Sequence, residues 1–177
     1  MKFVLVGVAG LLVLASAVLW MLRPTTRPAE GSLAPDFALR DQDGSTRRLR
    51  DYAGRWLVLY FYPRDDTPVC TREACRFRDD IGVFGDLGAA VVGVSVDDTD
   101  AHADFARKHR LPFPLLSDPD GRTAAAYGSL LNLGVLKFAR RHTFIIGPDG
   151  RIAARFDAVD SDTHAAEVAS RLSLLRR

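Results

Sequence analysis

The sequence has few metal-binding residues, and its charges nearly cancel. Only two cysteines and four histidines occur in 177 residues, and the histidines lie without the spacing of a metal site. We therefore expect no metal, and each histidine to be a surface or incidental residue. No glycine-rich phosphate loop or internal repeat is present. The formal net charge is +2, from 24 basic and 22 acidic residues, so no nucleic-acid surface is suggested. The four histidines are His102, His109, His142 and His164.

What the sequence does contain is a cysteine pair where an apolar strand leads into a helix. Thr67 is placed to cap this helix, Pro68 to occupy its first position and Cys70 to lie in its first turn. Free N–H groups and the positive end of the helix would then point at the Cys70 sulfur and make the thiol acidic. The alternative is that Cys70 is a small core residue. Both are compatible, because Cys70 heads the helical stripe Cys70, Ala74, Phe77, Ile81 and Phe84.

Cys75 falls on a different flank of the same helix. Five residues of helix place it about 140° around from Cys70, with the two Cα atoms about 8.6 Å apart. A disulfide bridges at most about 7 Å, so the helix must partly unwind for the sulfurs to bond. This spacing favours one sulfur that reacts alone and is resolved later by the second. The substrate should then be an oxidant.

The residues around Cys70 resemble a known family. Pro63, Thr67 and Cys70 match the P-x3-T-x2-C active-site motif of the peroxiredoxins, and the string from Tyr62 to Asp79 is similar to the bacterioferritin-comigratory-protein (PrxQ) branch. The resemblance implies an antioxidant thiol peroxidase that reduces hydrogen peroxide and organic hydroperoxides without a cofactor. It also implies that Cys70 is peroxidatic and forms a sulfenic acid. Cys75 would then resolve this acid as a Cys70–Cys75 disulfide.

The resemblance gives roles to three more residues. It implies that the Thr67 hydroxyl orients the thiolate and the peroxide, and that Pro63 shields the site from water. It also implies an arginine from a distant strand, for which Arg141 is a better positional match than Arg140. A guanidinium would stabilise the thiolate and the developing oxyanion. An ordinary helix cap, a turn proline and a solvated basic pair are the alternative interpretations. By the same resemblance we expect a thioredoxin-like or glutaredoxin-like reductant and a monomer.

Acidic residues near this motif are expected to have ordinary roles. Glu73 could brace the arginine, but its place in a first helical turn is explained by the helix dipole, so we leave it outside the predicted site. The acidic run 97–100 could hold a divalent cation, but ending a strand and capping the next helix is the better interpretation. Asp65 and Asp66 are expected to be solvated.

The pattern of apolar runs predicts the fold. Residues 57–62 and 91–96 are typical of strands covered on both faces, with the Cys70 helix between them as a βαβ crossover. Turn signals at Asp43-Gly44 and at 147–150 predict hairpins, and 163–176 predicts a closing helix. We expect an α/β thioredoxin-like fold, a mixed sheet flanked by helices, in one domain over 32–177.

The N-terminal 22 residues differ from the rest of the chain. Residues 3–22 carry no charge and could cross a bilayer as one helix, so we expect a transmembrane anchor followed by a linker over 23–31. The anchor would be single-pass in a bacterial inner membrane, with the catalytic domain periplasmic. Alternatively, cleavage after Ala15-Ser16-Ala17 would secrete the protein to the periplasm.

Two other functions and one unassigned segment stay open. A membrane-anchored thioredoxin-like disulfide reductase should show C-x-x-C and a proline where Thr143 stands. A copper metallochaperone of the same fold should show C-x3-C and a distant histidine, such as His142. The cysteine spacing disagrees with both. The apolar stretch 130–138 could pack over the pocket, touch a membrane or pair with a second subunit, and packing is our expectation.

Overall fold

The structure is a computed structural model, and residues 27–177 are the part of the chain that it describes. In chain order the elements are β1 (Ala38–Asp41), β2 (Thr46–Arg48), the 3-10 helix η1 (Leu49–Tyr52), β3 (Trp56–Phe61), α2 (Pro68–Asp79), α3 (Ile81–Asp86), β4 (Ala89–Ser95), α4 (Thr99–His109), β5 (Leu115–Ser117), α5 (Arg122–Ala126), β6 (Leu130–Asn132), β7 (Lys137–Ala139), β8 (His142–Ile146), β9 (Ile152–Phe156) and α6 (His164–Leu175).

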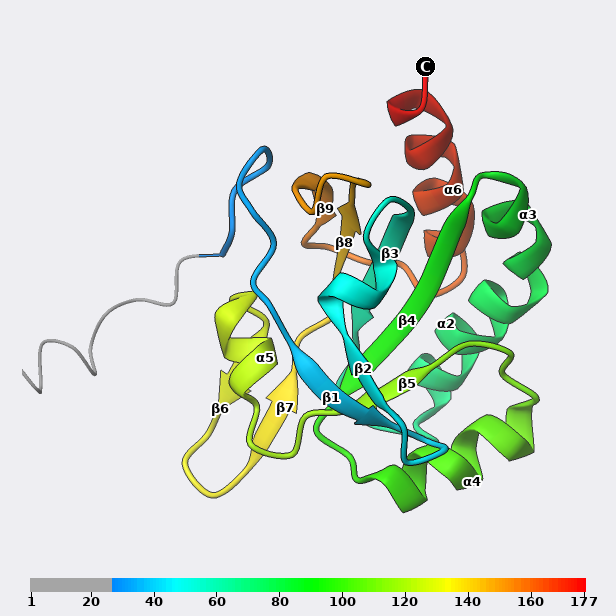
Figure 1. Ribbon diagram of the computed structural model, residues 1–177. Helices are drawn as coiled ribbons and strands as arrows, with labels where there is room; N and C mark the ends of the chain where they lie inside the picture. The colour runs from blue at the N-terminus through cyan, green and yellow to red at the C-terminus, as the bar shows by residue number, and fades with distance from the viewer. Residues whose placement is uncertain (1–26) are drawn as a thin grey trace, which may run out of the picture.

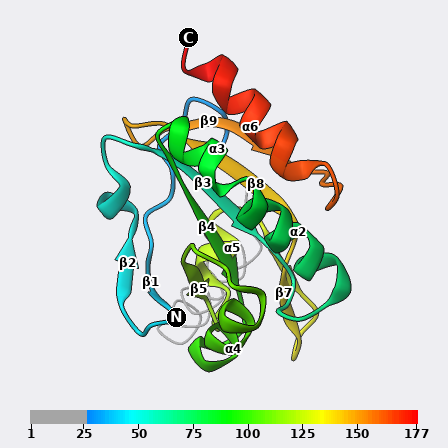
Figure 2. The ribbon, with the colours of Figure 1, turned by 90° about the vertical axis from the view of Figure 1, so that its right-hand side faces the viewer.

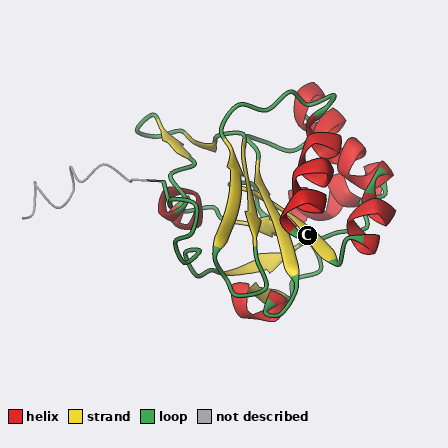
Figure 3. Ribbon diagram, turned by 90° about the horizontal axis from the view of Figure 1, so that it is seen from above, coloured by secondary structure: helices red, strands yellow, loops and turns green. Residues whose placement is uncertain are grey.

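A mixed seven-stranded sheet runs through the centre of the molecule (Figure 3). Its strand order is β2-β1-β5-β4-β3-β8-β9. β3, β4 and β5 are parallel, whereas β8, β9, β1 and β2 join in antiparallel pairings. In the middle of the sheet, Val58 of β3 lies between Val91 of β4 and Ile145 of β8. Because β3 and β4 are parallel neighbours joined through α2 and α3, the predicted βαβ crossover and thioredoxin-like sheet are confirmed.

Helices cover both faces of the sheet, which gives two apolar cores. Alternate residues of β3 point to opposite sides: Val58 and Tyr60 face α2, α3, α4 and α6, whereas Leu57, Leu59 and Phe61 face α5. Figure 1 shows α2, α3 and α6 together on one side of the sheet and α5 on the other. Figure 2 shows β1 and β2 at the edge away from α2. The long apolar runs of the sequence are therefore explained by strands buried on both faces.

The predicted stripe of the Cys70 helix is divided between two helices. α2 ends at Asp79 and α3 begins at Ile81, with Asp80 between them at φ −92° and ψ 7°. The backbone N–H of Asp80 donates to Arg76, whereas its carbonyl accepts from Phe84 in α3. The stripe still packs as one face, because Phe77 and Phe84 are both fully buried with ring centroids 5.7 Å apart.

The apolar stretch 130–138 forms the small hairpin of β6 and β7. Leu130 packs partly against the core around α5, but the tip faces solvent, and the Val135 side chain is 98% exposed. The expectation that packing buries this stretch is therefore wrong at the tip. A two-stranded hairpin outside the main sheet cannot bury the residues of its own turn.

The predicted membrane segment lies outside the described residues. Within 27–177, none of the helices combines the length and the apolar character needed to cross a bilayer.

Candidate active site

Cys70 lies in the first turn of α2, just beyond the end of β3. Thr67 is the last residue before the helix, with an extended backbone at φ −77° and ψ 145°, and Pro68 is the first helical residue. The unpaired backbone N–H groups of the first turn and the positive end of the helix therefore lie around Cys70. The Cys70 side chain is only 1% exposed. A charge on its sulfur must be stabilised by protein groups, because little water reaches it.

Arg141 supplies a positive charge at the sulfur. It lies between β7 and β8, and its Nη2 donates a hydrogen bond to the Cys70 Sγ at 2.9 Å. Its Nη1 forms an ion pair with Glu73 Oε2 at 2.5 Å. Arg140 instead has an exposed side chain, and its backbone N–H donates to Ser129. Of the two arginines, Arg141 is therefore the one that contacts the sulfur, and a guanidinium in this position can stabilise negative charge there.

Glu73 belongs with Arg141 and Cys70, so leaving it outside the predicted site was wrong, and the alternative that it braces the arginine is confirmed. Its side chain is 1% exposed, and Oε1 has no hydrogen-bond partner among residues 27–177. Burial raises the pKa of Glu73 to about 7, which outweighs the opposing effect of Arg141. One signal was present in the sequence, because Glu73 follows Cys70 by three residues and so shares its helix face. Arg141 thus bridges the Cys70 thiol and the Glu73 carboxyl.

The buried Glu73 carboxyl should make stability fall as pH rises. Its folded-state pKa of about 7 lies above the reference value of 4.5, so the folded protein holds an extra proton between these values. The unfolding free energy should therefore decrease from pH 4.5 to pH 7, at up to about 1.4 kcal/mol per pH unit. Urea unfolding of Glu73→Gln at several pH values in this range should lack that contribution. The matched control is Glu30→Gln, at an exposed glutamate; an equal slope in the two variants would contradict this origin.

Thr67 and Pro63 flank the cysteine but do not bond to its sulfur. The Thr67 hydroxyl donates to the carbonyl of Arg64 at 3.2 Å, and it accepts no helix N–H. Thr67 therefore occupies the predicted capping position, but its side chain does not cap the helix. The loop turns the Arg64 carbonyl towards the hydroxyl instead. Pro63 is half-buried and lines a groove of about 400 Å³ with Arg64, the strand end at 96–97 and the β6–β7 hairpin.

Cys75 lies further along α2, and both cysteines are free. Its side chain is half-buried, on the flank that the sequence predicts. Because α2 is continuous from Pro68 to Asp79, the two cysteine Cα atoms stand about 8.6 Å apart, as in any regular helix. This exceeds the span of a disulfide. The sulfurs can bond only after the helix between them unwinds.

Three of the four histidines are buried, so the expectation of incidental surface histidines is wrong for them. His102 and His164 are 0% exposed and His142 is 3% exposed. His142 lies 2.9 Å from the Ser129 hydroxyl, and His164 lies 2.7 Å from that of Thr143. Burial lowers the pKa of His142 and of His164 to about 4, so both rings are neutral near pH 7. In the described part of the chain, no group of three or more His, Cys, Asp or Glu side chains is placed to hold a metal ion.

The side chain of Asp65 is also buried, and the expectation that it is solvated is wrong. Its side chain is 7% exposed; it accepts a hydrogen bond from Tyr62 Oη at 2.7 Å and lies 2.7 Å from His102 Nδ1. Asp66 is exposed, as expected. Asp98 caps α4 by accepting from the backbone N–H of Ala101, which confirms the predicted role of the acidic run.

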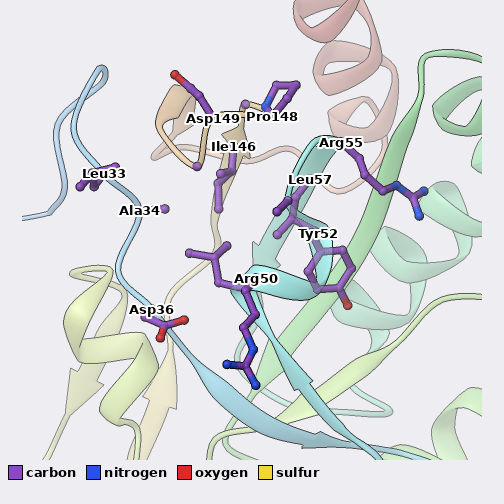
Figure 4. A pocket seen from close by; sticks show the side chains of 14 residues that line it. Leu33, Ala34, Asp36, Arg50, Tyr52, Arg55, Leu57, Ile146, Pro148 and Asp149 are labelled. Atoms are coloured by element: carbon purple, nitrogen blue, oxygen red, sulfur yellow. The ribbon is translucent and has the colours of Figure 1, made fainter.

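A second hollow, of about 390 Å³, lies away from the cysteines (Figure 4). Leu57, at the start of β3, lines it, whereas Cys70 follows the end of the same strand. The hollow is therefore at the opposite end of the sheet from Cys70. The other labelled lining residues are Leu33, Ala34, Asp36, Arg50, Tyr52, Arg55, Ile146, Pro148 and Asp149.

Known proteins resemble this chain over most of its length. The model of the AhpC/TSA family matches residues 31–155. The putative peroxiredoxin bcp of Coxiella burnetii is 42% identical over 146 residues, which cover 80% of this chain and 97% of that protein. Peroxiredoxin Bcp of Bacillus subtilis is 42% identical over 141 residues, which cover 77% of this chain and 90% of that protein.

Solved structures give the same result. Peroxidoxin BcpB from Mycobacterium tuberculosis superposes with a TM-score of 0.81 at 36% identity, covering 85% of this chain and 100% of that chain. Xanthomonas campestris Peroxiredoxin Q gives a TM-score of 0.73 at 34% identity, covering 78% of this chain and 90% of that chain. The family match, the two relatives and the shared fold together show that the protein belongs to the AhpC/TSA family, in its Bcp/PrxQ group of peroxiredoxins, and is a thiol-dependent peroxidase.

Proposed function

We propose that Cys70 is the peroxidatic cysteine and that Cys75 resolves its oxidised form. The observation that carries this proposal is the 2.9 Å hydrogen bond from Arg141 Nη2 to the Cys70 Sγ. The bond lies at the N-terminus of a twelve-residue helix, where aligned N–H groups add to the positive potential. Both features stabilise a sulfur anion in a place that water hardly reaches.

The first step is an attack of the Cys70 thiolate on the terminal oxygen of a hydroperoxide. A sulfur–oxygen bond forms as the oxygen–oxygen bond breaks, which leaves a sulfenic acid and releases hydroxide or an alkoxide that takes up a proton. Negative charge thus moves from sulfur to the leaving oxygen. Arg141 keeps its guanidinium beside both atoms throughout this shift, so it stabilises the transition state as well as the thiolate.

The second step is an attack of the Cys75 sulfur on the Cys70 sulfenic sulfur. A disulfide forms and the sulfenic oxygen leaves as water. The helix must unwind between the cysteines. We place the limit of this unwinding before Phe77, because its ring stacks on Tyr60 with centroids 4.7 Å apart, and Arg78 Nη1 donates to the carbonyl of His109.

Thr67 and Pro63 complete the proposed site. The Thr67 hydroxyl orients the peroxide towards the sulfur, and Pro63 restricts access of bulk water. These two roles are supported by the loop that carries both residues. Its Thr67 end leads directly into the Cys70 helix, and its Pro63 end lines the groove described above. Membership of the family implies a peroxide substrate and a thioredoxin-type reductant. We propose that both hydrogen peroxide and organic hydroperoxides are reduced.

The test is to mix the reduced protein with hydrogen peroxide and a dithiol, then follow peroxide loss and count free thiols. We expect catalytic turnover, and loss of two thiols per chain when the dithiol is omitted, recovered on its return. A parallel Cu(I) titration addresses the metallochaperone. Stoichiometric copper binding without peroxide turnover would contradict the proposed peroxidase.

We propose that the protein is a monomer held at a bacterial inner membrane by residues 3–22, with its catalytic domain in the periplasm. The support is the uncharged run of 20 residues and the proline-containing spacer after it. Membrane fractionation and intact mass test the anchor together. Recovery of a soluble periplasmic protein shortened near Ala17 would favour the cleaved signal instead.

A further inference from the structure

The loop between β3 and α2 holds a conformation that its own sequence does not favour. It spans residues 62–67 and carries Pro63 and Thr67, both placed in the proposed site. Asp66 has a φ of +55°, in the left-handed region that side chains other than glycine adopt at a cost. Such a loop keeps its shape only when neighbouring elements hold it. The shape also fixes the Thr67 hydroxyl, since its acceptor is the Arg64 carbonyl of the same loop.

Asp65 fixes the middle of this loop on three sides. One carboxylate oxygen accepts from Tyr62 Oη at 2.7 Å, and the other lies 2.7 Å from His102 Nδ1. The backbone N–H of Asp65 donates to Asp97 Oδ2 at 2.9 Å. Because an ionised carboxylate only accepts hydrogen bonds, His102 Nδ1 must carry the hydrogen. The loop is thereby joined to β3, to the end of β4 and to α4, which lies below α2 in Figure 1.

Only one of the two ring nitrogens of His102 has a hydrogen-bond partner among residues 27–177. Its ring is fully buried in α4, and Nε2 has no hydrogen-bond partner within residues 27–177. An unsatisfied buried nitrogen is destabilising, so an aliphatic residue would serve the core better at this position. What the imidazole provides, and an aliphatic side chain would not, is the donor to Asp65.

A second contact between the same loop and α4 lies at the surface. The Asp66 carboxylate oxygen Oδ1 accepts a hydrogen bond from Lys108 Nζ at 2.9 Å and lies 3.1 Å from His109 Nε2. Exposed ion pairs of this kind contribute little. The two histidines of α4 thus offer a matched pair, one buried against Asp65 and one beside the exposed Asp66.

We propose that His102 is a positioning residue of the peroxidase reaction: through Asp65 it holds the 62–67 loop so that Thr67 meets the peroxide at the Cys70 sulfur. The proposal rests on the function assigned to Cys70 above. It concerns how the peroxide is oriented, and not how the thiolate is formed, since Arg141 and the helix N-terminus act on the sulfur without His102. Loss of His102 should therefore impair reaction with peroxide far more than reaction with an electrophile that needs no orientation.

The test uses the full chain with His102→Leu, His102→Asn and the control His109→Leu. Stopped-flow rates with hydrogen peroxide are compared with alkylation rates of Cys70 by iodoacetamide, with Cys75→Ser in every variant. We expect His102→Leu to react with peroxide about 10- to 100-fold more slowly, since small misplacements have effects of this size, while alkylation stays within about threefold. His102→Asn, whose amide can donate near the Nδ1 position, should keep both rates within about threefold of the parent.

A variant that removes the whole contact protects the test against misfolding. His102→Leu leaves Asp65 without one partner, and adding Asp65→Ala would leave the buried Tyr62 hydroxyl without its acceptor. The triple variant Tyr62→Phe, Asp65→Ala, His102→Leu removes all three polar groups, a change that is often nearly neutral for stability. The triple variant should fold and still react slowly with peroxide. A peroxide rate within about threefold of the parent in the folded triple variant, or equal losses in the His102→Leu and His109→Leu chains, would overturn the proposal. Failure of the proposed function looks different, because peroxide reduction would then survive Cys70→Ser.

Discussion

Cys70→Ser is expected to lower the rate of peroxide reduction by at least about a thousandfold. A serine hydroxyl stays protonated near neutral pH even beside Arg141, and it lacks the nucleophilicity of a thiolate towards oxygen. The fold should persist, because serine is close to cysteine in size and the Arg141–Glu73 ion pair does not involve the sulfur. The measurement is kcat/KM for hydrogen peroxide with an excess of dithiol, together with a urea unfolding curve. Undiminished turnover in the folded variant would contradict the assignment of Cys70.

Cys75→Ser is the matched control on the same helix. Its first reaction with peroxide should keep the parent rate within about threefold, because the sulfur that attacks the peroxide is that of Cys70. Recycling should change, since no intramolecular disulfide can form. Excess peroxide should then convert Cys70 to the sulfinic acid, seen as a mass gain of about 32 Da. A parent-like disulfide cycle in this variant would show that Cys75 is not the resolving residue.

Arg141→Met is expected to lower the second-order rate with peroxide by about a hundred- to a thousandfold, the usual effect of removing a charged donor from a reacting centre. It should also slow alkylation of Cys70, because the positive charge 2.9 Å from the sulfur is lost. The rate of iodoacetamide alkylation measures this second effect independently of peroxide. A variant with both the parent alkylation rate and the parent peroxide rate would contradict the role of Arg141.

Two controls separate chemistry from stability in that experiment. Arg140→Met removes the neighbouring charge, whose side chain is exposed, and should leave both rates within about threefold of the parent. Arg141→Met with Glu73→Gln removes both partners of the ion pair, so no uncompensated carboxylate is left in the core. The double variant should recover stability without recovering the peroxide rate. Recovery of both would mean that Arg141 acts only by neutralising Glu73.

The architecture could be predicted because it depends on local patterns. Buried strands appear as unbroken apolar runs, and the βαβ crossover follows from a helical stripe between two of them. The helix start at Cys70 was recognised for the same reason, since a threonine at the cap position and a proline at the first helical position indicate a helix N-terminus without any distant contact. Arg141 was found only through resemblance, because nothing in its own segment points to a thiol 71 residues earlier.

The errors fall on residues whose partners are distant in the chain. Glu73 was left outside the site because its own helix explained it, but it is paired with an arginine 68 residues away. Asp65 and His102 are 37 residues apart, and each by itself is an ordinary surface residue type. Burial of a polar side chain depends on the complementary group that packing brings to it, and neither local sequence supplies that information.

By itself, then, the sequence determined the central strands, the helix between them and where a helix N-terminus presents a thiol, because these follow from apolar periodicity and backbone capping within a few residues. Tertiary structure alone decided which guanidinium contacts the sulfur and which carboxyl it also neutralises. It also decided which histidine holds the preceding loop. These interactions are ion pairs and hydrogen bonds, so their strength depends on distances of about 3 Å and on the exclusion of water. Both the distances and the exclusion of water are set only when distant segments pack together.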